Sequence, residues 1–235
     1  MKSAAQLLSL SIKSLLLGVF GLLLLYQFWL FCWVLWWNWI NPDTTRFMAI
    51  RLAELQIKDP RAQLKKQWVV YGRISINLKR AIIVSEDDLF IHHEGFDWGG
   101  IQKAMEKNQR RGKIVAGGST ISQQLAKNLF LTPSKTPWRK AEEAIITLMI
   151  ESVWSKQRIF EVYLNVIEWG NGVFGAEAAA RHYYGISAAQ LGPEQAARLA
   201  GMVPSPRFYD RNRNAPGLAN KAAIILARMP SAQVP

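Results

Sequence analysis

The longest uncharged stretch of the chain constrains its architecture more than any other feature. Residues 14–40 read SLLLGVFGLLLLYQFWLFCWVLWWNWI and contain no charged side chain. At 1.5 Å per residue the stretch would form about 40 Å of helix, enough to cross a hydrocarbon core of about 30 Å. Five of the ten Trp lie between Trp29 and Trp39, as in an interfacial aromatic belt. A cleavable signal peptide has a shorter apolar core and a small-residue cleavage site. The stretch therefore predicts a retained transmembrane helix.

This helix divides the chain into a short N-terminus (1–13), a membrane span (14–40) and a globular domain (41–235). The charges that flank the span do not decide its orientation, because basic residues follow it as well as precede it. A short cytoplasmic N-terminus with the large domain outside is the commoner arrangement, and we adopt it as the expectation. Cys32 lies inside the span, so cysteine usage gives no indication of the compartment.

The globular part is strongly basic. It carries all but two of the 29 Lys and Arg residues together with all 17 acidic residues. Such a balance attracts anionic lipid head groups or a phosphorylated substrate. Nucleic acid is the other usual partner of a basic domain, but a membrane anchor argues against it, so we expect no nucleic acid partner.

Helical periodicity dominates the globular part, and strand-like alternation is scarce. The best strand candidate is VVYGRISI at residues 69–76. Ser155 is a suitable N-cap, and Pro193 stands in the first turn of another predicted helix. We expect a mainly α fold with helices near residues 78–85, 101–111, 119–130, 138–154, 155–167, 176–184, 193–202 and 219–228.

The segment GGSTISQQLAKN at residues 117–128 combines a glycine loop with a helix start capped by Ser119 or Thr120. Free N–H groups at a helix N-terminus bind anions. Ser119, Gln123 and Lys127 recur every four residues, and this pattern predicts one polar face suited to a diphosphate or to sugar hydroxyls. A capped helix with a solvated face explains the same residues equally well.

A second basic segment, KTPWRKAEE, spans residues 135–143. Arg139 and Lys140 stand four and three residues before Glu143, which is the spacing of ordinary surface ion pairs on a helix. Together with Lys127 and Lys135 they form four cations near one carboxylate. That set could instead hold a phosphate group.

The segment SEDDLFIHHEGFD at residues 85–97 holds five acidic residues and two of the three histidines. Its adjacent histidines, His92 and His93, do not match a metal-binding spacing, so we predict no metal site. Glu86 and Asp87 end an apolar segment, where burial would raise a carboxyl pKa toward the range of a general base. We expect His92 to hold the loop in shape.

These segments occur in one order together with KQRIFEVYLNVIEWGNGVFGAEAAARHYYG (156–185) and LAGMVPSPRFYDR (199–211). In that order they resemble the five sequence blocks of the peptidoglycan glycosyltransferase family, over about residues 81–211. GGSTxxQQ with its downstream Lys is the most specific block. The chain has no S-x-x-K motif, so we expect no transpeptidase domain and a closer likeness to the stand-alone, membrane-anchored members.

The resemblance implies a lysozyme-like fold with two lobes and a groove, with the basic stretch 101–117 in the place of a segment near the membrane. It implies polymerisation of lipid II with inversion, with Glu86 as general base and Glu143 as the second carboxylate. Lys127 and Lys135 match positions that contact the diphosphate, although related enzymes often have Arg at the latter. The full predicted substrate-binding set is Asp87, Ser119, Thr120, Gln123, Gln124, Lys127, Lys135, Arg139 and Lys140.

The same resemblance predicts which molecules the chain meets and where. The substrates are lipid II and a lipid-linked glycan strand, met at a membrane surface, and other cell-wall synthases are further candidate partners. No cofactor is required, and a role for a divalent cation (Mg²⁺ or Mn²⁺) stays open. The expected location is the bacterial inner membrane, with a single span and the catalytic domain on the periplasmic side.

Two other functions fit parts of the sequence. A lysozyme-like wall hydrolase or lytic transglycosylase would use a Glu as an acid, but it has little need of Lys127 and Lys135. A membrane-tethered basic scaffold for wall synthases would need no catalysis at all.

Overall fold

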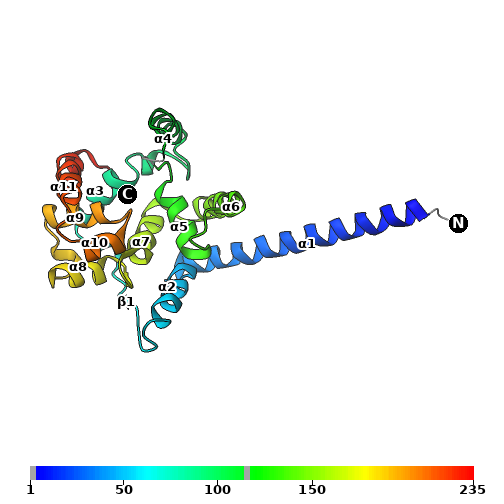
Figure 1. Ribbon diagram of the computed structural model, residues 1–235, viewed down its shortest axis with the longest axis horizontal. Coiled ribbons are helices and arrows are strands. Elements are labelled where there is room, and N and C mark those ends of the chain that lie inside the picture. The colour runs from blue at the N-terminus through cyan, green and yellow to red at the C-terminus, as the bar shows by residue number, and fades with distance from the viewer. Residues whose placement is uncertain (1–3, 114–116) are drawn as a thin grey trace. The chain divides into compact units, whose positions relative to one another are not determined.

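The computed structural model describes residues 4–113 and 117–235, and the side chains of residues 12–113 and 117–235. The rest of the predicted N-terminal segment and of the basic stretch 101–117 lies outside the described residues. The chain separates into two compact units, Met1–Asn41 and Pro42–Pro235 (Figure 1). The first unit contains helix α1 (Ala4–Trp39). Within the described residues, one segment is long and apolar enough to cross a membrane: Ile12–Trp39, with a mean hydropathy of 2.2.

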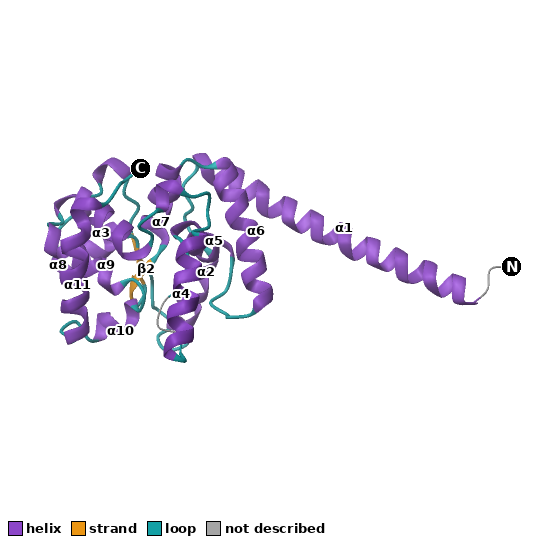
Figure 2. Ribbon diagram, turned by 90° about the horizontal axis from the view of Figure 1, so that it is seen from above, coloured by secondary structure: helices purple, strands orange, loops and turns teal. Residues whose placement is uncertain are grey.

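The second unit is mainly α, as the sequence predicts. Its longer helices form two groups (Figure 2). Helix α9 packs against both α3 and α11, while α5 packs against α2, α6 and α7. The helices are α2 (Arg46–Gln56), α3 (Ile76–Glu86), α4 (Trp98–Arg111), α5 (Ile121–Phe130), α6 (Pro137–Val153), α7 (Lys156–Val166), α8 (Ala176–Tyr184), α9 (Pro193–Met202), α10 (Pro206–Arg211) and α11 (Pro216–Arg228).

Helix α3 carries the first predicted catalytic residue to the centre of the unit. The Ser75 hydroxyl accepts a hydrogen bond from the N–H of Asn77 and caps the helix start. Ile82 and Ile83 are fully buried, so the apolar run anchors the last turns in the core. The helix ends at Glu86, because Asp87 adopts a non-helical backbone. Burial of the preceding turns thus fixes Glu86 at the inner end of α3.

Helix α5 is built on a buried apolar row. Ile121, Leu125 and Leu129 are at most 1 % exposed, as their spacing predicts. The opposite side carries Gln124 and Lys127, which are half-buried. Because α5 packs between α6, α7 and α2, these two polar side chains lie inside the unit rather than on an outer face.

The predicted strand at residues 69–76 is wrong. Residues Tyr71–Arg73 form a 3₁₀ turn and Ile76 begins α3. The side-chain amide of Asn165 bonds both the N–H (2.9 Å) and the carbonyl (3.0 Å) of Val69, and Glu161 accepts from the N–H of Tyr71 (3.0 Å). Side chains of α7 therefore satisfy the backbone groups that a neighbouring strand would otherwise bind.

The described residues form one small sheet, which the sequence did not predict. Its strands are β1 (Lys65–Lys66), β2 (Glu168–Gly170) and β3 (Val173–Phe174), in the order β1-β3-β2. Strand β1 runs parallel to β3, and β2 runs antiparallel to it. The buried β2 places Glu168 at the centre of the unit.

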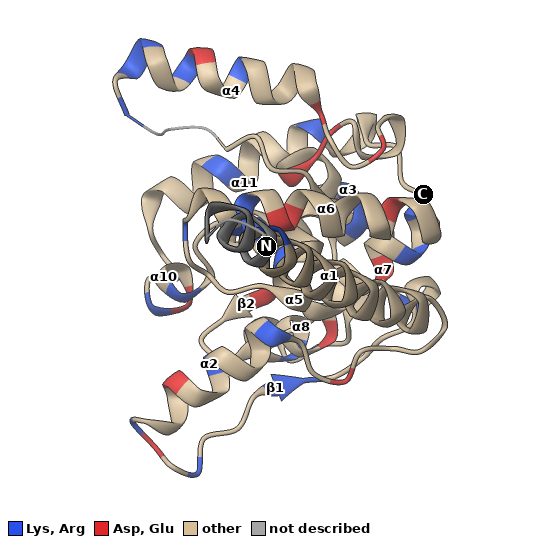
Figure 3. Cartoon of the chain, turned by 90° about the vertical axis from the view of Figure 1, so that its right-hand side faces the viewer, with Lys and Arg blue, Asp and Glu red and all other residues tan. Residues whose placement is uncertain are grey.

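Helix α4 projects from the body of the second unit (Figure 3). Among its residues only Ala104 is buried, and Lys and Arg side chains recur along it. The helix starts at Trp98, three residues before the predicted start, because an Asp97 carboxylate oxygen accepts from the N–H of Gly100 (2.8 Å) and caps the first turn.

Candidate active site

A groove of about 710 Å³ runs across the second unit. Helix α5 contributes Gln124, Lys127 and Asn128 to its wall, and the following loop contributes Lys135. The other walls come from α2, from β2 and the turn after it, and from α10 with the loop before it. Its volume is in the range of sites that take small molecules. Three residues of the predicted substrate-binding set thus line one concave surface: Gln124, Lys127 and Lys135.

Glu86 is bound to one of the wall residues of this groove. The Gln124 amide donates to Glu86 Oε2 at 3.0 Å, and the Ser85 hydroxyl donates to Oε1 at 3.2 Å. Burial raises the pKa of Glu86, and the Gln124 hydrogen bond and the positive charge of Lys221 oppose part of that rise. The structure therefore gives Glu86 the raised carboxyl pKa that its sequence context predicts.

A second hydrogen bond fixes the orientation of the Gln124 amide. The hydroxyl of Tyr163, a fully buried residue of α7, donates to Gln124 Oε1 at 3.0 Å. The Gln124 nitrogen must therefore face Glu86, where it can only donate. Since an amide donor favours the ionised carboxylate, the chain Tyr163–Gln124–Glu86 keeps Glu86 able to accept a proton.

The second predicted carboxylate is held differently. Glu143, on α6, is 3 % exposed and forms ion pairs with Arg139 Nη1 and Lys140 Nζ. Lys140 also donates to the hydroxyl of Ser119 at 3.2 Å, which links α6 to the loop before α5. The spacing of these residues is that of surface ion pairs. In the structure, however, the carboxylate is buried between the two cations.

Lys127 lies within the electrostatic influence of both carboxylates. Burial lowers its pKa, while the negative charges of Glu143 and Glu86 act in the opposite direction. No hydrogen bond or ion pair of the Lys127 ammonium is formed among the described residues. A half-buried cation without a direct partner, in the wall of a groove, is suited to an anionic ligand.

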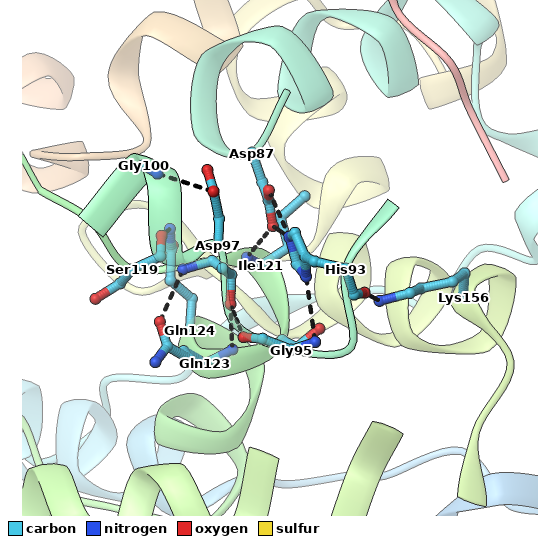
Figure 4. Close-up of polar contacts among 12 residues, drawn as sticks. Asp87, His93, Gly95, Asp97, Gly100, Ser119, Ile121, Gln123, Gln124 and Lys156 are labelled. Carbon is cyan, nitrogen blue, oxygen red and sulfur yellow. Dashed lines mark hydrogen bonds and ion pairs between the residues drawn. The ribbon is translucent and has the colours of Figure 1, made fainter. Parts of the chain in front are cut away.

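Asp87 faces away from the groove, although it follows Glu86 directly. Its carboxylate accepts from the N–H of Ile121 (2.9 Å) and from Nε2 of His93 (2.9 Å) (Figure 4). The N–H of Gly95 donates to Nδ1 of His93, so the proton of the neutral ring lies on Nε2. His93 therefore holds the loop, and the prediction that His92 does so is wrong. His92 is exposed and contacts Gln233.

Thr120 and Gln123 cap helix α5. The Thr120 hydroxyl accepts from the N–H of Gln123, and the Gln123 side chain accepts from the N–H of Thr120. Both residues are at most 3 % exposed. The spacing of Gln123 suggests that it shares an open polar face with Ser119 and Lys127, but its side chain is used in the cap. Gln124 takes the position on that face instead.

The loop around Gly95 is packed closely against α6 and bonded to the cap of α5. Thr120 donates its hydroxyl proton to the carbonyl of Gly95 at 2.7 Å. Gly95 has a φ of +89°, and a Cβ there would come within 2.7 Å of the Thr147 side chain. The close approach and the positive φ both require glycine. The loop that follows Glu86 and the residues before α5 are therefore packed together.

Among the described residues there is no group of three His, Cys, Asp or Glu side chains that could hold a metal ion. Both oxygens of Glu143 already face cations, and those of Asp87 face hydrogen-bond donors. The described donor set does not fit a divalent cation bound by protein ligands alone.

Comparison with known proteins matches this arrangement to one family. The family model described as transglycosylase matches residues 53–230. The chain is 76 % identical to the biosynthetic peptidoglycan transglycosylase of Dechloromonas aromatica (strain RCB), over 95 % of this chain and 97 % of the relative. It is 65 % identical to the protein of the same name from Methylobacillus flagellatus, over 91 % and 93 % of the two chains. A third relative of that name, from Azoarcus sp. (strain BH72), is 62 % identical, with 94 % and 95 % covered.

The chain belongs to the transglycosylase family. The match confirms the resemblance drawn from the five sequence blocks. It extends beyond the blocks on both sides, from α2 through most of η4 (Met229–Ser231). In this transglycosylase Glu86, the Glu143 ion pairs and the groove wall from Lys58 onward lie within the matched residues.

Several groove residues of the transglycosylase were missed from the sequence. Asn128 lies four residues after Gln124, so the helical spacing of α5 could have revealed it. Tyr163 and Lys221 act near Glu86 from α7 and α11, and no local pattern marks them. The remaining polar groove residues come from distant segments: Arg51, Lys58, Glu168, Asn171, Ser205, Arg207 and Arg211.

Proposed function

We propose that this protein polymerises lipid II into glycan strands with inversion at the anomeric carbon, using Glu86 as general base. The chain is a peptidoglycan glycosyltransferase of the bacterial cell wall, as its family and its relatives indicate. The observation that carries the residue assignment is the position of Glu86. Its side chain is half-buried, desolvation raises its pKa, and it is bound to a wall residue of the groove that also contains Lys127 and Lys135.

Glu86 is suited to take the proton of a sugar 4-hydroxyl during attack on the donor sugar. A general base works best when its pKa lies near the operating pH, and burial moves the carboxyl pKa in that direction. The hydrogen bond from Gln124 occupies Oε2 and leaves Oε1 with a single weak partner, the hydroxyl of Ser85. Oε1 is therefore the oxygen that we assign to the incoming hydroxyl.

The leaving group in this reaction is a diphosphate, which departs as a stable anion and needs no strong acid. The useful contribution is positive charge placed where negative charge develops. Lys127 and Lys135 line the groove from two adjacent segments, and we assign the diphosphate to them. Arg139 and Lys140 are held by Glu143 beside Lys127, where they add to the positive field. In this proposal Glu143 positions cations and transfers no proton.

A membrane location follows from the chemistry of the substrates. Lipid II and the growing strand are both lipid-linked, and the chain carries one helix able to anchor it in the same bilayer. We propose a single span at residues 14–40 in the inner membrane, with residues 41–235 on the periplasmic side where the wall is built. Other cell-wall synthases that act on the same strand are proposed partners.

The experiment is an assay of the purified full-length protein with lipid II in detergent micelles. We expect glycan polymer together with released undecaprenyl diphosphate. Cleavage of finished glycan strands in place of polymerisation would favour a lytic enzyme. Binding of lipid II without turnover would favour a scaffold, and either result would overturn the proposal.

A further inference from the structure

The groove continues past Lys127 and Lys135 into a second group of cations that the proposed reaction does not use. A cavity of about 300 Å³ adjoins the main groove and shares with it the residues Arg51, Lys58, Glu168, Asn171 and Arg207. Arg211 lines the main groove beside them. We propose that this basic arm (Arg51, Lys58, Arg207 and Arg211) binds carboxylates of the peptides carried by the glycan strand. The inference rests on the proposed function.

The basic arm carries more positive charge than its own acids neutralise. Lys58 and Arg211 are exposed and form no ion pair among the described residues. Arg51 and Arg207 both contact Glu54, at 2.6 and 3.4 Å. With Glu168, the arm thus has four cations and two carboxylates. An anionic ligand would neutralise the excess positive charge of the arm, whereas a neutral sugar alone would not.

Arg51 is held ready for such a ligand. Its Nε donates to Glu168 Oε2 at 3.2 Å, its Nη1 contacts Glu54, and its guanidinium carbon lies 4.7 Å from the centre of the Phe47 ring. Nε has no further donor, but one N–H of Nη1 is left, and Nη2 has no contact among those formed by the described residues. A guanidinium fixed in this way binds a carboxylate with little further loss of side-chain entropy.

Glu168 adds a preference for a ligand with N–H groups. It is 6 % exposed, lines both cavities, and its Oε1 is a buried oxygen without a hydrogen-bond partner among the described residues. Such an oxygen favours any ligand that brings a donor to it. Amide N–H groups and carboxylates together are the recognition elements of a peptide. A diphosphate has no N–H group, and the diphosphate of the donor is already assigned to Lys127 and Lys135.

The shape of the arm favours a chain over a lipid surface. Its cations come from α2, from the turn after α2 and from α10. Arg51, Lys58 and Arg207 line both the smaller cavity and the main groove, and Arg211 lines the main groove. A linear strand that occupies the groove at Lys127 would extend into this arm, and its peptides would extend with it. Lipid head groups form a flat array, which fits an exposed convex surface better than a groove.

The test compares two lipid II substrates that differ only in their peptide carboxylates, which are free in one and amidated in the other. The double variant Lys58→Ala, Arg211→Ala removes the two exposed, unpaired cations and leaves the Arg51–Glu168 pair intact. We expect the wild-type kcat/KM to favour the free carboxylates about fivefold, the effect of roughly 1 kcal/mol of exposed ion pairing. The double variant should lose that preference, so that its kcat/KM no longer differs between the two substrates.

The control variant is Arg80→Ala, which removes one exposed cation of α3 that does not line either cavity. It should keep the preference for free carboxylates. Equal preference in the wild type and the double variant, or an equal loss on both substrates, would overturn the inference. A defect of the double variant that appears only on vesicles with anionic lipid would also overturn it, in favour of head-group binding. If the wild-type protein formed no polymer from either substrate, the proposed function itself would be refuted.

Discussion

Two carboxylates, at the end of α3 and near the start of α6, are held by opposite means. Glu86 is bound by an amide and a hydroxyl, and its pKa is raised by burial. Glu143 is buried, whereas Glu86 is half-buried, and Arg139 and Lys140 contact the two oxygens of Glu143. Lys127 interacts with both carboxylates. The two sites thus differ mainly in the charge of their immediate neighbours.

This difference separates two chemical tasks. A carboxylate surrounded by neutral donors keeps an affinity for protons, which a general base needs. A carboxylate whose two oxygens each contact a cation orients those cations and prevents their mutual repulsion from displacing them. The comparison assigns proton transfer to the end of α3 and electrostatic support to the start of α6.

The largest effect should come from Glu86→Gln. The substitution keeps the shape of the side chain and an oxygen for Gln124, but it removes the base. We expect the polymerisation rate to fall by about a thousandfold, within the range for loss of general base catalysis. The measurement is the initial rate of polymer formation from lipid II. Circular dichroism should be unchanged, and a variant that polymerises at the wild-type rate would refute the assignment of the base.

A smaller loss should follow Lys127→Ala. The groove then lacks the cation that stands between both carboxylates, and the donor diphosphate loses one charge-assisted contact, worth about 2 kcal/mol. We expect a roughly thirtyfold loss of kcat/KM, with Lys127→Arg recovering part of it because the charge is kept. Arg80→Ala serves as the matched control. Donor binding and rate that equal those of the wild type would exclude the phosphate role of Lys127.

Stability should respond with opposite signs at the two carboxylates. Glu143→Gln leaves Arg139 and Lys140 without a countercharge, and we expect unfolding at neutral pH to become easier by about 2 kcal/mol. This is below the range for a fully buried pair because Lys140 is 46 % exposed. Glu86→Gln should instead stabilise the fold by on the order of 1 kcal/mol, because it removes a buried charge that serves function rather than folding.

The gain in stability of Glu86→Gln should depend on pH. The folded pKa of Glu86 lies above its unfolded value, so the group is least destabilising below the unfolded pKa and most destabilising above the folded one. Thermal unfolding of Glu86→Gln should therefore show its advantage at neutral pH and lose it as the pH falls below the ordinary pKa of Glu. An advantage of the same size at acidic pH would show that burial of charge is not its cause.

Elements with strong end signals were predictable from the sequence. Pro193 and Ser155 fix the starts of α9 and α7, and Gly185 ends α8 with a left-handed backbone. Helix α2 was not among the predicted helices, although Thr45 caps it through Met48 N. Its amphipathic pattern is weak, since most of its residues are polar or only half-buried.

The site was predictable only where local rules decide the outcome. Glu86 follows an apolar run, is half-buried and has a raised pKa, as the sequence indicates. Gln123 was assigned to an open face, but the signature of Thr120 followed by Gln at the third position is that of a capping box, and this was visible in the sequence. Arg51 and Glu168 lie 117 residues apart and meet only in the fold, so no periodicity could connect them.

The subtlest test changes the neighbour of the base rather than the base. Gln124→Ala removes the amide that favours the ionised form of Glu86, so the pKa of Glu86 should rise further above its ordinary value. Because the base acts only when deprotonated, the acidic limb of the kcat/KM profile should move to higher pH. Near the alkaline plateau the rate should fall only a few-fold, because the carboxylate itself remains.

Asn128→Ala, one turn further along the same groove wall, serves as the control. It should leave the acidic limb in place, since Asn128 bonds the Gln124 carbonyl and not Glu86. An acidic limb that stays fixed in Gln124→Ala while the plateau rate falls would mean that Gln124 acts on substrate binding, and the contrast between neutral and charged neighbours would then lose its functional meaning.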